Sequence, residues 1–127
     1  MSDYVLDASA LIAFIRDEPG AERTRATLSS ASISAVNLAE VGARMADLGF
    51  EPGEIFDEAS DLRLKVVAFD NAQAKLSARL RQETRDAGLS LGDRACLALA
   101  RQLDAIALTT DRAWASLNLD IEIELIR

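Results

Sequence analysis

A strand, a single acid and a helix follow one another in residues 4–16, which read YVLDASALIAFIR. The apolar run at 4–6 predicts a short buried strand that ends at Asp7. Residues 8–16 then repeat apolar side chains at helical spacing, and the sequence DEPG at 17–20 ends the helix. In α/β proteins, ligands gather beyond the carboxyl ends of such strands, so Asp7 is a first candidate for a functional site.

The same alternation continues along the rest of the chain. Apolar runs predict further strands at 32–35, 65–69, 105–109 and 121–125. Helical spacing and end residues predict helices at 21–28, 36–48, 52–62, 71–87, 91–103 and 111–117. Gly49 and Gly88 are expected to end two of these helices. Strands that alternate with helices indicate an α/β fold with a parallel sheet covered on both faces.

The composition fits one domain without a membrane anchor. The chain has 127 residues and half of them are hydrophobic, which is enough for one sizeable core. No apolar run is long enough to span a membrane, and the N-terminus lacks the pattern of a signal peptide. Cys96 is the only cysteine, which suits a reducing cytoplasm, and we expect it to be a small core residue. We therefore expect a single domain over residues 1–127 that acts in the cytoplasm.

The absence of histidine restricts the chemistry of the chain. Ser-His-Asp and Cys-His nucleophilic systems are excluded in their usual forms, as are histidine-based ribonuclease mechanisms and zinc sites built on histidine. One cysteine cannot form a cysteine-rich zinc site. If the chain is an enzyme, its chemistry depends on carboxylates, hydroxyls, lysine, arginine or a bound metal.

The net charge adds a second restriction. The chain has 21 acidic and 14 basic residues, a net charge of −7. This balance weighs against nonspecific binding of nucleic acid, which requires a basic surface. A nuclease of this composition would need bound cations and a local basic rim, whereas a basic protein is a plausible partner for an acidic chain.

Four acids stand out by position, and each has an ordinary alternative explanation. Asp7 and Asp111 follow apolar strands, and either could simply cap a helix. Asp93 stands three residues after Ser90, as in a capping box, and Glu40 lies at the border of an apolar helix face, where it could reach water. If the four acids share one pocket, their mutual repulsion requires raised pKa values or bound cations. An all-oxygen set of ligands suits Mg²⁺ or Mn²⁺.

Four sequence blocks resemble those of the PIN-domain ribonucleases, and most closely those of the VapC-type toxins of bacterial toxin–antitoxin pairs. The blocks are VLDASAL at 5–11, NLAE at 37–40, LGDRACLA at 91–98 and LTTDRAW at 108–114. They occur in the order found in the family and span essentially the whole chain. The resemblance implies a three-layer α/β/α fold with a central parallel sheet.

The resemblance also implies a site and an activity. The acidic metal-binding positions of the family are occupied here by Asp7, Glu40, Asp93 and Asp111. Its two flanking hydroxyl positions are occupied by Ser9 and Thr109. The implied activity is Mg²⁺- or Mn²⁺-dependent endonucleolytic cleavage of RNA. The implied partners are the RNA substrate, a cognate antitoxin protein and a second copy of the chain in a homodimer.

One position departs from the pattern of the family, because Trp114 stands where some members carry a further acid. A second metal would then be held weakly or with the help of substrate phosphate, and Trp114 itself is expected to pack in the core. Arg94 and Arg112 directly follow two of the acids and are candidates for contacts with RNA phosphates, although either could equally be solvated or paired with a nearby acid. Without histidine to assist a 2′-hydroxyl, we expect products with 5′-phosphate and 3′-hydroxyl ends.

Two further features leave alternatives open. Asn37 could orient the site, but its position near the start of a helix explains it as well. The helix at 36–48 and the helix that begins near residue 54 could form a groove for a partner helix, or their apolar residues could be internal core.

Two other functional classes are alternatives to a nuclease. A receiver-like phosphoacceptor domain also has an acidic Mg²⁺ site, and Asp70 follows the strand at 65–69 as a phosphorylated aspartate would. Receivers carry adjacent acids after the first strand and a lysine near the last, whereas Asp7 stands alone and the only lysines are Lys65 and Lys75. The second alternative is a noncatalytic binding module that keeps the fold without the activity.

Overall fold

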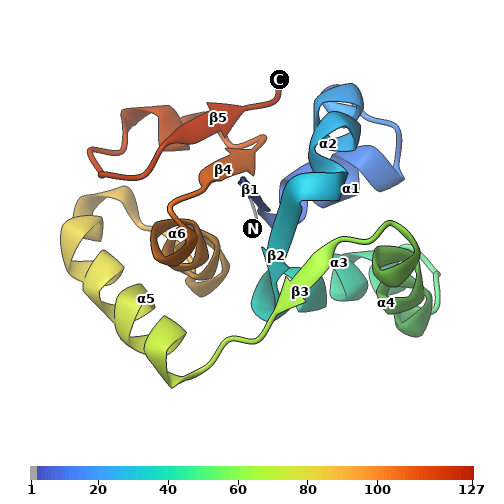
Figure 1. Ribbon diagram of the computed structural model, residues 1–127, viewed down its shortest axis with the longest axis horizontal. Coiled ribbons are helices and arrows are strands. Elements are labelled where there is room, and N and C mark those ends of the chain that lie inside the picture. The colour runs from blue at the N-terminus through green and yellow to red at the C-terminus, as the bar shows by residue number, and fades with distance from the viewer. Residues whose placement is uncertain (1–2) are drawn as a thin grey trace.

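Strand β1 (Tyr4–Leu6) is the central strand of the sheet in the computed structural model, which describes residues 3–127 (Figure 1). It pairs in parallel with β2 (Ala31–Ser34) on one side and β4 (Ile106–Thr109) on the other. The edge strands β3 (Lys65–Val67) and β5 (Ile123–Leu125) are also parallel to their neighbours. The order β3-β2-β1-β4-β5 confirms the predicted parallel sheet.

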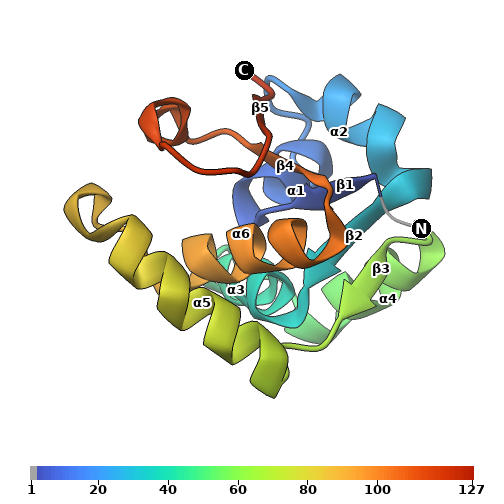
Figure 2. The same ribbon diagram turned by 60° about the vertical axis from the view of Figure 1, so that its left-hand side comes forward.

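Side chains of β1 point alternately into two hydrophobic cores, as successive residues of a strand do. Leu6 packs in the core on one face and Val5 in the core on the other. The face of Leu6 is covered by α1 (Ala8–Ile15), α2 (Ala21–Thr27), α3 (Ala35–Asp47) and α4 (Pro52–Asp61). The face of Val5 is covered by α5 (Asn71–Glu83) and α6 (Leu91–Leu103). Figures 1 and 2 show the two groups of helices on opposite sides of the sheet, which confirms the three-layer α/β/α arrangement.

Polar residues at the ends of strands start several of the helices. Each of the helices α1, α3, α5 and α6 begins after a residue whose side chain accepts a hydrogen bond from a backbone N–H of the first turn. These caps are Asp7, Ser34, Asp70 and Ser90. A cap of this kind satisfies a backbone donor that the helix itself leaves unpaired. At Asp7 and Ser34 the chain therefore turns from strand to helix within one or two residues at the carboxyl edge of the sheet.

Some predicted elements end earlier than expected. The predicted helix at 71–87 is α5 followed by a short 3-10 turn, η2 (Arg85–Ala87), and Thr84 leaves the helical conformation between them. The hydroxyl of Thr84 donates to the carbonyl of Leu80 at 2.6 Å, a bond that disfavours a regular helix. The end of the predicted helix at 21–28 is a 3-10 turn, η1 (Leu28–Ser30). The predicted helix at 111–117 is the 3-10 helix η3 (Arg112–Ser116).

Glycines end two elements as predicted, and the helix expected to be buried is buried. Gly49 follows α3 with φ 93° and Gly88 follows η2 with φ 64°, a backbone region in which side chains are strained. Six successive residues of α6, Ala95 to Ala100, are at most 1% exposed. Cys96 and Trp114 are both fully buried, so both are core residues as expected. No helix within residues 3–127 is long and apolar enough to cross a membrane.

Candidate active site

Asp7 lies at the carboxyl end of β1, where the register brings it beside β4. Leu6 pairs with Leu108, and the backbone N–H of Asp7 donates to the carbonyl of Leu108 at 3.1 Å. The side chain of Asp7 is only 6% exposed. Its Oδ1 accepts from the N–H of Ala10 at 2.9 Å and from the hydroxyl of Ser9 at 2.7 Å. Asp7 is therefore a helix cap, as its ordinary explanation requires, but it is also a buried carboxylate.

The second oxygen of Asp7 is bound by β4. The hydroxyl of Thr109, which is fully buried, donates to Oδ2 of Asp7 at 2.5 Å and accepts from the N–H of Asp111 at 3.0 Å. The N–H of Thr110 donates to the hydroxyl of Ser9 at 3.0 Å, which ties the two strand ends together a second time. The two hydroxyls matched by sequence, Ser9 and Thr109, thus both hold the carboxylate of Asp7.

Burial raises the pKa of Asp7 from its ordinary value of 3.8 to about 6. The hydrogen bonds from Thr109, Ser9 and the backbone of Ala10 oppose this rise, and the negative charge of Asp93 adds to it. Loss of hydration disfavours the ionised form, and a nearby like charge does the same. A cation beside this carboxylate would offset both penalties.

Glu40 projects from α3 toward the first turn of α6. Its Oε1 accepts from Nδ2 of Asn37 at 2.9 Å, and the same Nδ2 donates to the carbonyl of Gly92 at 3.0 Å. A Cβ at position 92 would overlap the carboxylate group of Glu40. Glu40 itself is exposed, whereas Asn37 is 1% exposed. The carboxylate of Glu40 therefore lies directly against the α6 backbone at its amino end.

Asp93 forms the capping box that its sequence predicts. The N–H of Asp93 donates to the hydroxyl of Ser90 at 3.1 Å, and Oδ2 of Asp93 accepts from the N–H of Ser90 at 3.0 Å. The ordinary explanation of Asp93 is thus correct. Asp93 is half-buried and close enough to Asp7 to raise its pKa, so the cap and a role in the site are compatible.

Three of the four acids lie near enough to Cys96 on α6 for their charges to act on its thiol. The fully buried thiol of Cys96 has a pKa well above its ordinary value, first because of burial and then because of the negative charges of Asp7, Asp93 and Glu40. Asp111 is exposed, and its Oδ1 caps η3 by accepting from the N–H of Ala113 at 3.0 Å. Among residues 3–127, no three acidic or cysteine side chains form a ready metal-binding group. The convergence of all four acids on one ion stays a prediction.

The two arginines differ. Nη1 of Arg94 lies 3.4 Å from the carbonyl of Ser77 on α5, and its Nε is buried without a hydrogen-bond partner. Arg112 is exposed and makes no ion pair or hydrogen bond through its side chain with any other residue in 3–127. The side chain of Arg94 therefore contacts the neighbouring helix α5, whereas that of Arg112 is exposed to solvent beside Asp111.

The receiver-like alternative is wrong. Its phosphorylated aspartate would follow a strand inside the sheet, but β3, the strand before Asp70, lies at the edge. Asp70 caps α5, because its Oδ1 accepts from the N–H of Gln73 at 3.0 Å. The acids of the site follow β1 and β4 or stand on α3 and α6.

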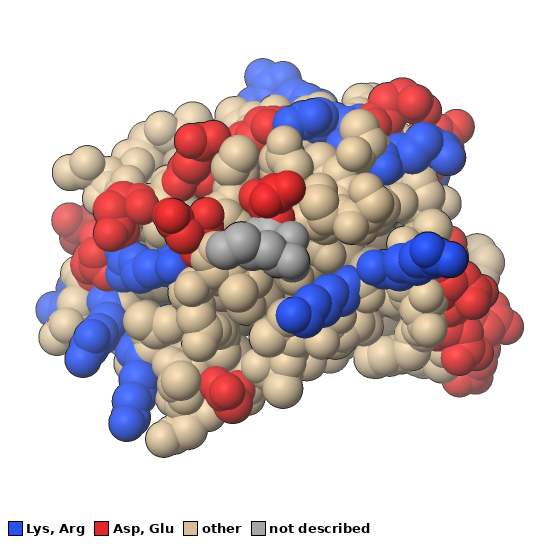
Figure 3. Space-filling view, in the orientation of Figure 1, with Lys and Arg blue, Asp and Glu red and all other residues tan. Residues whose placement is uncertain are grey.

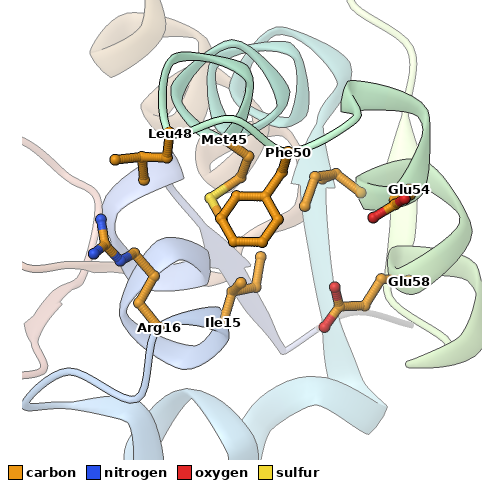
Figure 4. Close-up of a pocket in the computed structure, with 8 residues that line it drawn as sticks. Ile15, Arg16, Met45, Leu48, Phe50, Glu54 and Glu58 are labelled. Carbon is orange, nitrogen blue, oxygen red and sulfur yellow. The ribbon is translucent and has the colours of Figure 1, made fainter.

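A groove lies apart from the acids, between α1, α3 and α4, with a volume of about 470 Å³ (Figure 4). Its apolar lining includes Met45 and Ile55, which are buried core residues, and Phe50, which is 54% exposed. Arg16 stands on one side of the groove, and Glu54 and Glu58 stand on the other. The apolar residues of α3 and α4 thus form core and groove together, while a partner helix in the groove stays a prediction.

A parallel sheet with carboxylates at its carboxyl edge defines this chain as an α/β protein with an acidic site beyond β1 and β4. Residues 4–118 match the PIN domain family. The chain belongs to that family, which confirms the recognition made from the four sequence blocks. No curated protein matches the chain by sequence.

Solved structures with the same fold include toxin–antitoxin complexes. The chain is similar to a chain of a toxin–antitoxin complex from Klebsiella pneumoniae, with a TM-score of 0.76, 19% identity and 98% of both chains covered. It is similar to DNA-bound VapBC from Salmonella typhimurium, with a TM-score of 0.75, 20% identity and 100% of both chains covered. For VapBC-1 from nontypeable Haemophilus influenzae the TM-score is 0.71 at 18% identity, with 97% of both chains covered. At these identities the likeness shows the shared fold.

Proposed function

We propose that this chain is a VapC-type toxin, a cytoplasmic endoribonuclease that depends on Mg²⁺ or Mn²⁺ and is inhibited by an antitoxin protein. One observation carries the proposal: the carboxylate of Asp7 is buried, held by Ser9 and Thr109, and faces the charge of Asp93. Buried charges are normally paired or bound to metal. Membership of the PIN family and the fold shared with toxin–antitoxin complexes support the same function.

The donor atoms fit a hard divalent cation. Asp7, Glu40, Asp93 and Asp111 offer only oxygen ligands, as Mg²⁺ and Mn²⁺ prefer. When bound, such an ion lowers the pKa of water and stabilises the leaving oxygen of a phosphodiester. Trp114 is fully buried and cannot replace the further acid of some relatives, so substrate phosphate would complete any second metal site.

The residues of the chain have separable tasks in this reaction. Ser9 and Thr109 fix both oxygens of Asp7 in one orientation, so the carboxylate needs no reorganisation when it binds. In the metal-free chain Asp7 takes up a proton below about pH 6, so protons compete with the cation for this carboxylate and activity is expected to fall on the acid side. Arg112, exposed beside Asp111, is placed to contact a substrate phosphate, whereas Arg94 would first have to leave Ser77.

The uneven surface charge would let this acidic chain approach RNA. Exposed basic residues gather on α5 at Lys75, Arg79 and Arg81, and no acid lies between Asn71 and Gln82. Exposed acidic residues gather on α4 at Glu54, Asp57, Glu58 and Asp61. Figure 3 shows the basic side chains at the lower left, over α5, and the acidic ones at the right, over α4. RNA would therefore approach over α5 and the amino end of α6.

The groove between α1, α3 and α4 suits a helix of the antitoxin. Its apolar floor fits the apolar face of an amphipathic helix, and basic residues of that helix would face Glu54 and Glu58. This assignment rests on the chemistry of the groove and on the resemblance. A second copy of the chain, forming a homodimer, is proposed from the resemblance alone, and light scattering of the purified protein tests it.

The deciding experiment is cleavage of total cellular RNA by the purified chain without its partner. We expect discrete cuts with Mn²⁺ or Mg²⁺ and none with EDTA, with 5′-phosphate and 3′-hydroxyl ends when the fragments are sequenced. Asp7→Asn and Asp93→Asn variants should both be inactive. Ends with 2′,3′-cyclic phosphate, or cutting that survives EDTA, would contradict the proposed mechanism.

One observation favours the noncatalytic binding module, namely that residues 3–127 contain no ready three-ligand metal group. Titration calorimetry with Mn²⁺ separates the two functions. Binding that is lost in Asp7→Asn supports the nuclease. A folded chain that neither binds Mn²⁺ nor cuts RNA would instead be the binding module.

A further inference from the structure

The carboxylate of Glu40 occupies the space that a side chain at position 92 would fill. A Cβ built on Gly92 would overlap Oε1, Oε2 and the carboxyl carbon of Glu40. Gly92 is a helical residue of α6 with no positive φ, so its backbone does not require glycine. Glycine inside a helix is unfavourable relative to alanine. The reason for glycine at this position is therefore the room that it leaves for Glu40.

The amide of Asn37 fixes the same carboxylate from the other side. Its Nδ2 donates both to Oε1 of Glu40 and to the carbonyl of Gly92. Both partners are acceptors, so the amide can adopt only this orientation, because the flipped one would bring three oxygens together. The orientation leaves the buried Oδ1 of Asn37 without a hydrogen-bond partner. Asn37 does stand in the first turn of α3, but Ser34 is the cap of that helix, so capping does not account for Asn37.

We propose that Asn37 and Gly92 form a clamp that positions Glu40 for the divalent cation. The clamp holds an exposed side chain of α3 against the first turn of α6, the turn that carries Asp93. It fixes the separation between two acids that stand on different helices. This inference rests on the proposed metal-dependent function, and it makes Asn37 and Gly92 positioning residues rather than ligands.

A purely structural role of the two residues predicts a different outcome. If Gly92 only packs α3 against α6, Gly92→Ala should leave cation binding intact and change only stability. If Gly92 makes room for Glu40, the added methyl displaces a flexible side chain at little cost in stability, and cation binding falls. Thermal unfolding and Mn²⁺ affinity of the same variant therefore separate the two roles.

The test uses the full chain and Mn²⁺ as the probe in titration calorimetry. We expect Gly92→Ala and Asn37→Leu each to weaken Mn²⁺ binding by about 10–100-fold, the usual loss when a residue that orients a metal ligand is removed.

The matched controls are Gly42→Ala and Gln73→Leu. Gly42 is a helical glycine of α3 where a Cβ makes only ordinary contacts, the nearest at 3.7 Å. Gln73 is a buried amide bonded to Gln102 across α5 and α6. Both controls should bind Mn²⁺ as the unchanged chain does.

A mutant cycle with Glu40→Ala shows whether the clamp acts through Glu40. In that background, Asn37→Leu and Gly92→Ala should cause no further loss of Mn²⁺ affinity. A further loss of about the same size in the absence of Glu40 would overturn the clamp, as would Gly92→Ala binding Mn²⁺ as tightly as Gly42→Ala. An unchanged chain that binds no Mn²⁺ overturns the proposed metal site and the clamp together, whereas failure of the clamp alone leaves Mn²⁺ binding by the unchanged chain intact.

Discussion

Asp7, at the end of β1, is 6% exposed and accepts three hydrogen bonds. Glu40, on α3, is exposed, accepts one hydrogen bond from an amide, and lies in the space that a side chain on Gly92 would fill. The first acid belongs to what we call the strand half of the site, with Ser9 and Thr109. The second belongs to the helix half, with Asn37 and Asp93. Backbone pairing fixes the strand half, because the register of β1 and β4 places its members side by side. The helix half is fixed instead by contacts that its side chains make with each other and with the backbone of α6 and Ser90.

The two halves should therefore respond to different disturbances. The strand half carries the cost of a buried charge, so it should respond to pH and to loss of charge. The helix half carries little buried charge, so it should respond to changes of shape.

Removing the charge of Asp7 should have the largest effect. We expect Asp7→Asn, which keeps the shape of the side chain, to reduce RNA cleavage by roughly 100-fold or more, since loss of a proposed ligand should cost at least as much as loss of a residue that orients one. Single-turnover cleavage in Mn²⁺ measures the effect. The folded state should survive, and circular dichroism provides that control. If the variant cleaves RNA within a factor of about three of the unchanged chain, the loss is smaller than that for a residue that only orients a metal ligand. The strand half would then not be the catalytic centre.

The stability of the metal-free chain should fall as the pH rises. The pKa of Asp7 is about 6 in the folded state against an ordinary 3.8, so between these values the folded state holds a proton that the unfolded state has released. The contribution of Asp7 to the free energy of unfolding should therefore be lower above pH 6 than at pH 4 and below, by roughly 3 kcal/mol. Urea unfolding at several pH values measures this. Asp7→Asn should lose the dependence, and an equal slope in both proteins would contradict the assignment to Asp7.

Thr109→Val should weaken the strand half without removing its charge. The hydroxyl of Thr109 donates to Asp7 and accepts from the backbone of Asp111, so its loss should cost about 1.5–3 kcal/mol of stability, the usual value for a hydrogen bond to a charged group. The pKa of Asp7 should rise further, because this hydrogen bond lowers it. Urea unfolding and the midpoint of its pH dependence test both points. Thr110→Val is the control, since only its backbone takes part in the network.

Ser90→Ala should have the smallest effect, and it lies in the helix half. Loss of the hydroxyl that caps α6 should cost about 1 kcal/mol of stability. Mn²⁺ affinity should change little, because Asp93 keeps its bond from the N–H of Ser90. Thermal unfolding and calorimetry measure the two quantities. If Ser90→Ala lost more Mn²⁺ affinity than Thr109→Val, the helix half would be the more sensitive of the two halves, contrary to this prediction.

The strand half could be predicted from the sequence far better than the helix half. A short apolar run that ends at an acid predicts a strand end, and parallel strands bring their carboxyl ends to one edge of the sheet, so the sequence alone makes Asp7 and Asp111 candidates. The spacing of Asn37 and Glu40 places them on one helix face. Nothing in the sequence, however, says that the first turn of α6 packs against that face, because contacts between helices depend on the whole fold.

Local chemistry also decides details that periodicity cannot. The helical pattern continues through Thr84, but α5 ends there, where the hydroxyl of Thr84 donates to the carbonyl of Leu80. Arg94 stands next to Asp93 in the sequence, yet its guanidinium lies against the carbonyl of Ser77, since a long side chain can reach a neighbouring helix. The convergence of all four acids stays a prediction, because it depends on side-chain positions that a bound cation would itself alter.

The bare Cα of Gly92 has a consequence for genetic selection. Every amino-acid replacement at position 92 adds at least one carbon where the carboxylate of Glu40 lies, so all missense changes at this codon should act alike. On the proposed function, cells that survive expression of the chain should therefore include ones with changes at position 92, with protein levels close to normal. Such chains would keep the groove between α1, α3 and α4, so an antitoxin that binds there, as proposed, would still be drawn away from active copies in the same cell. On the same proposal such an allele would be dominant, because it would leave active copies of the chain without their inhibitor.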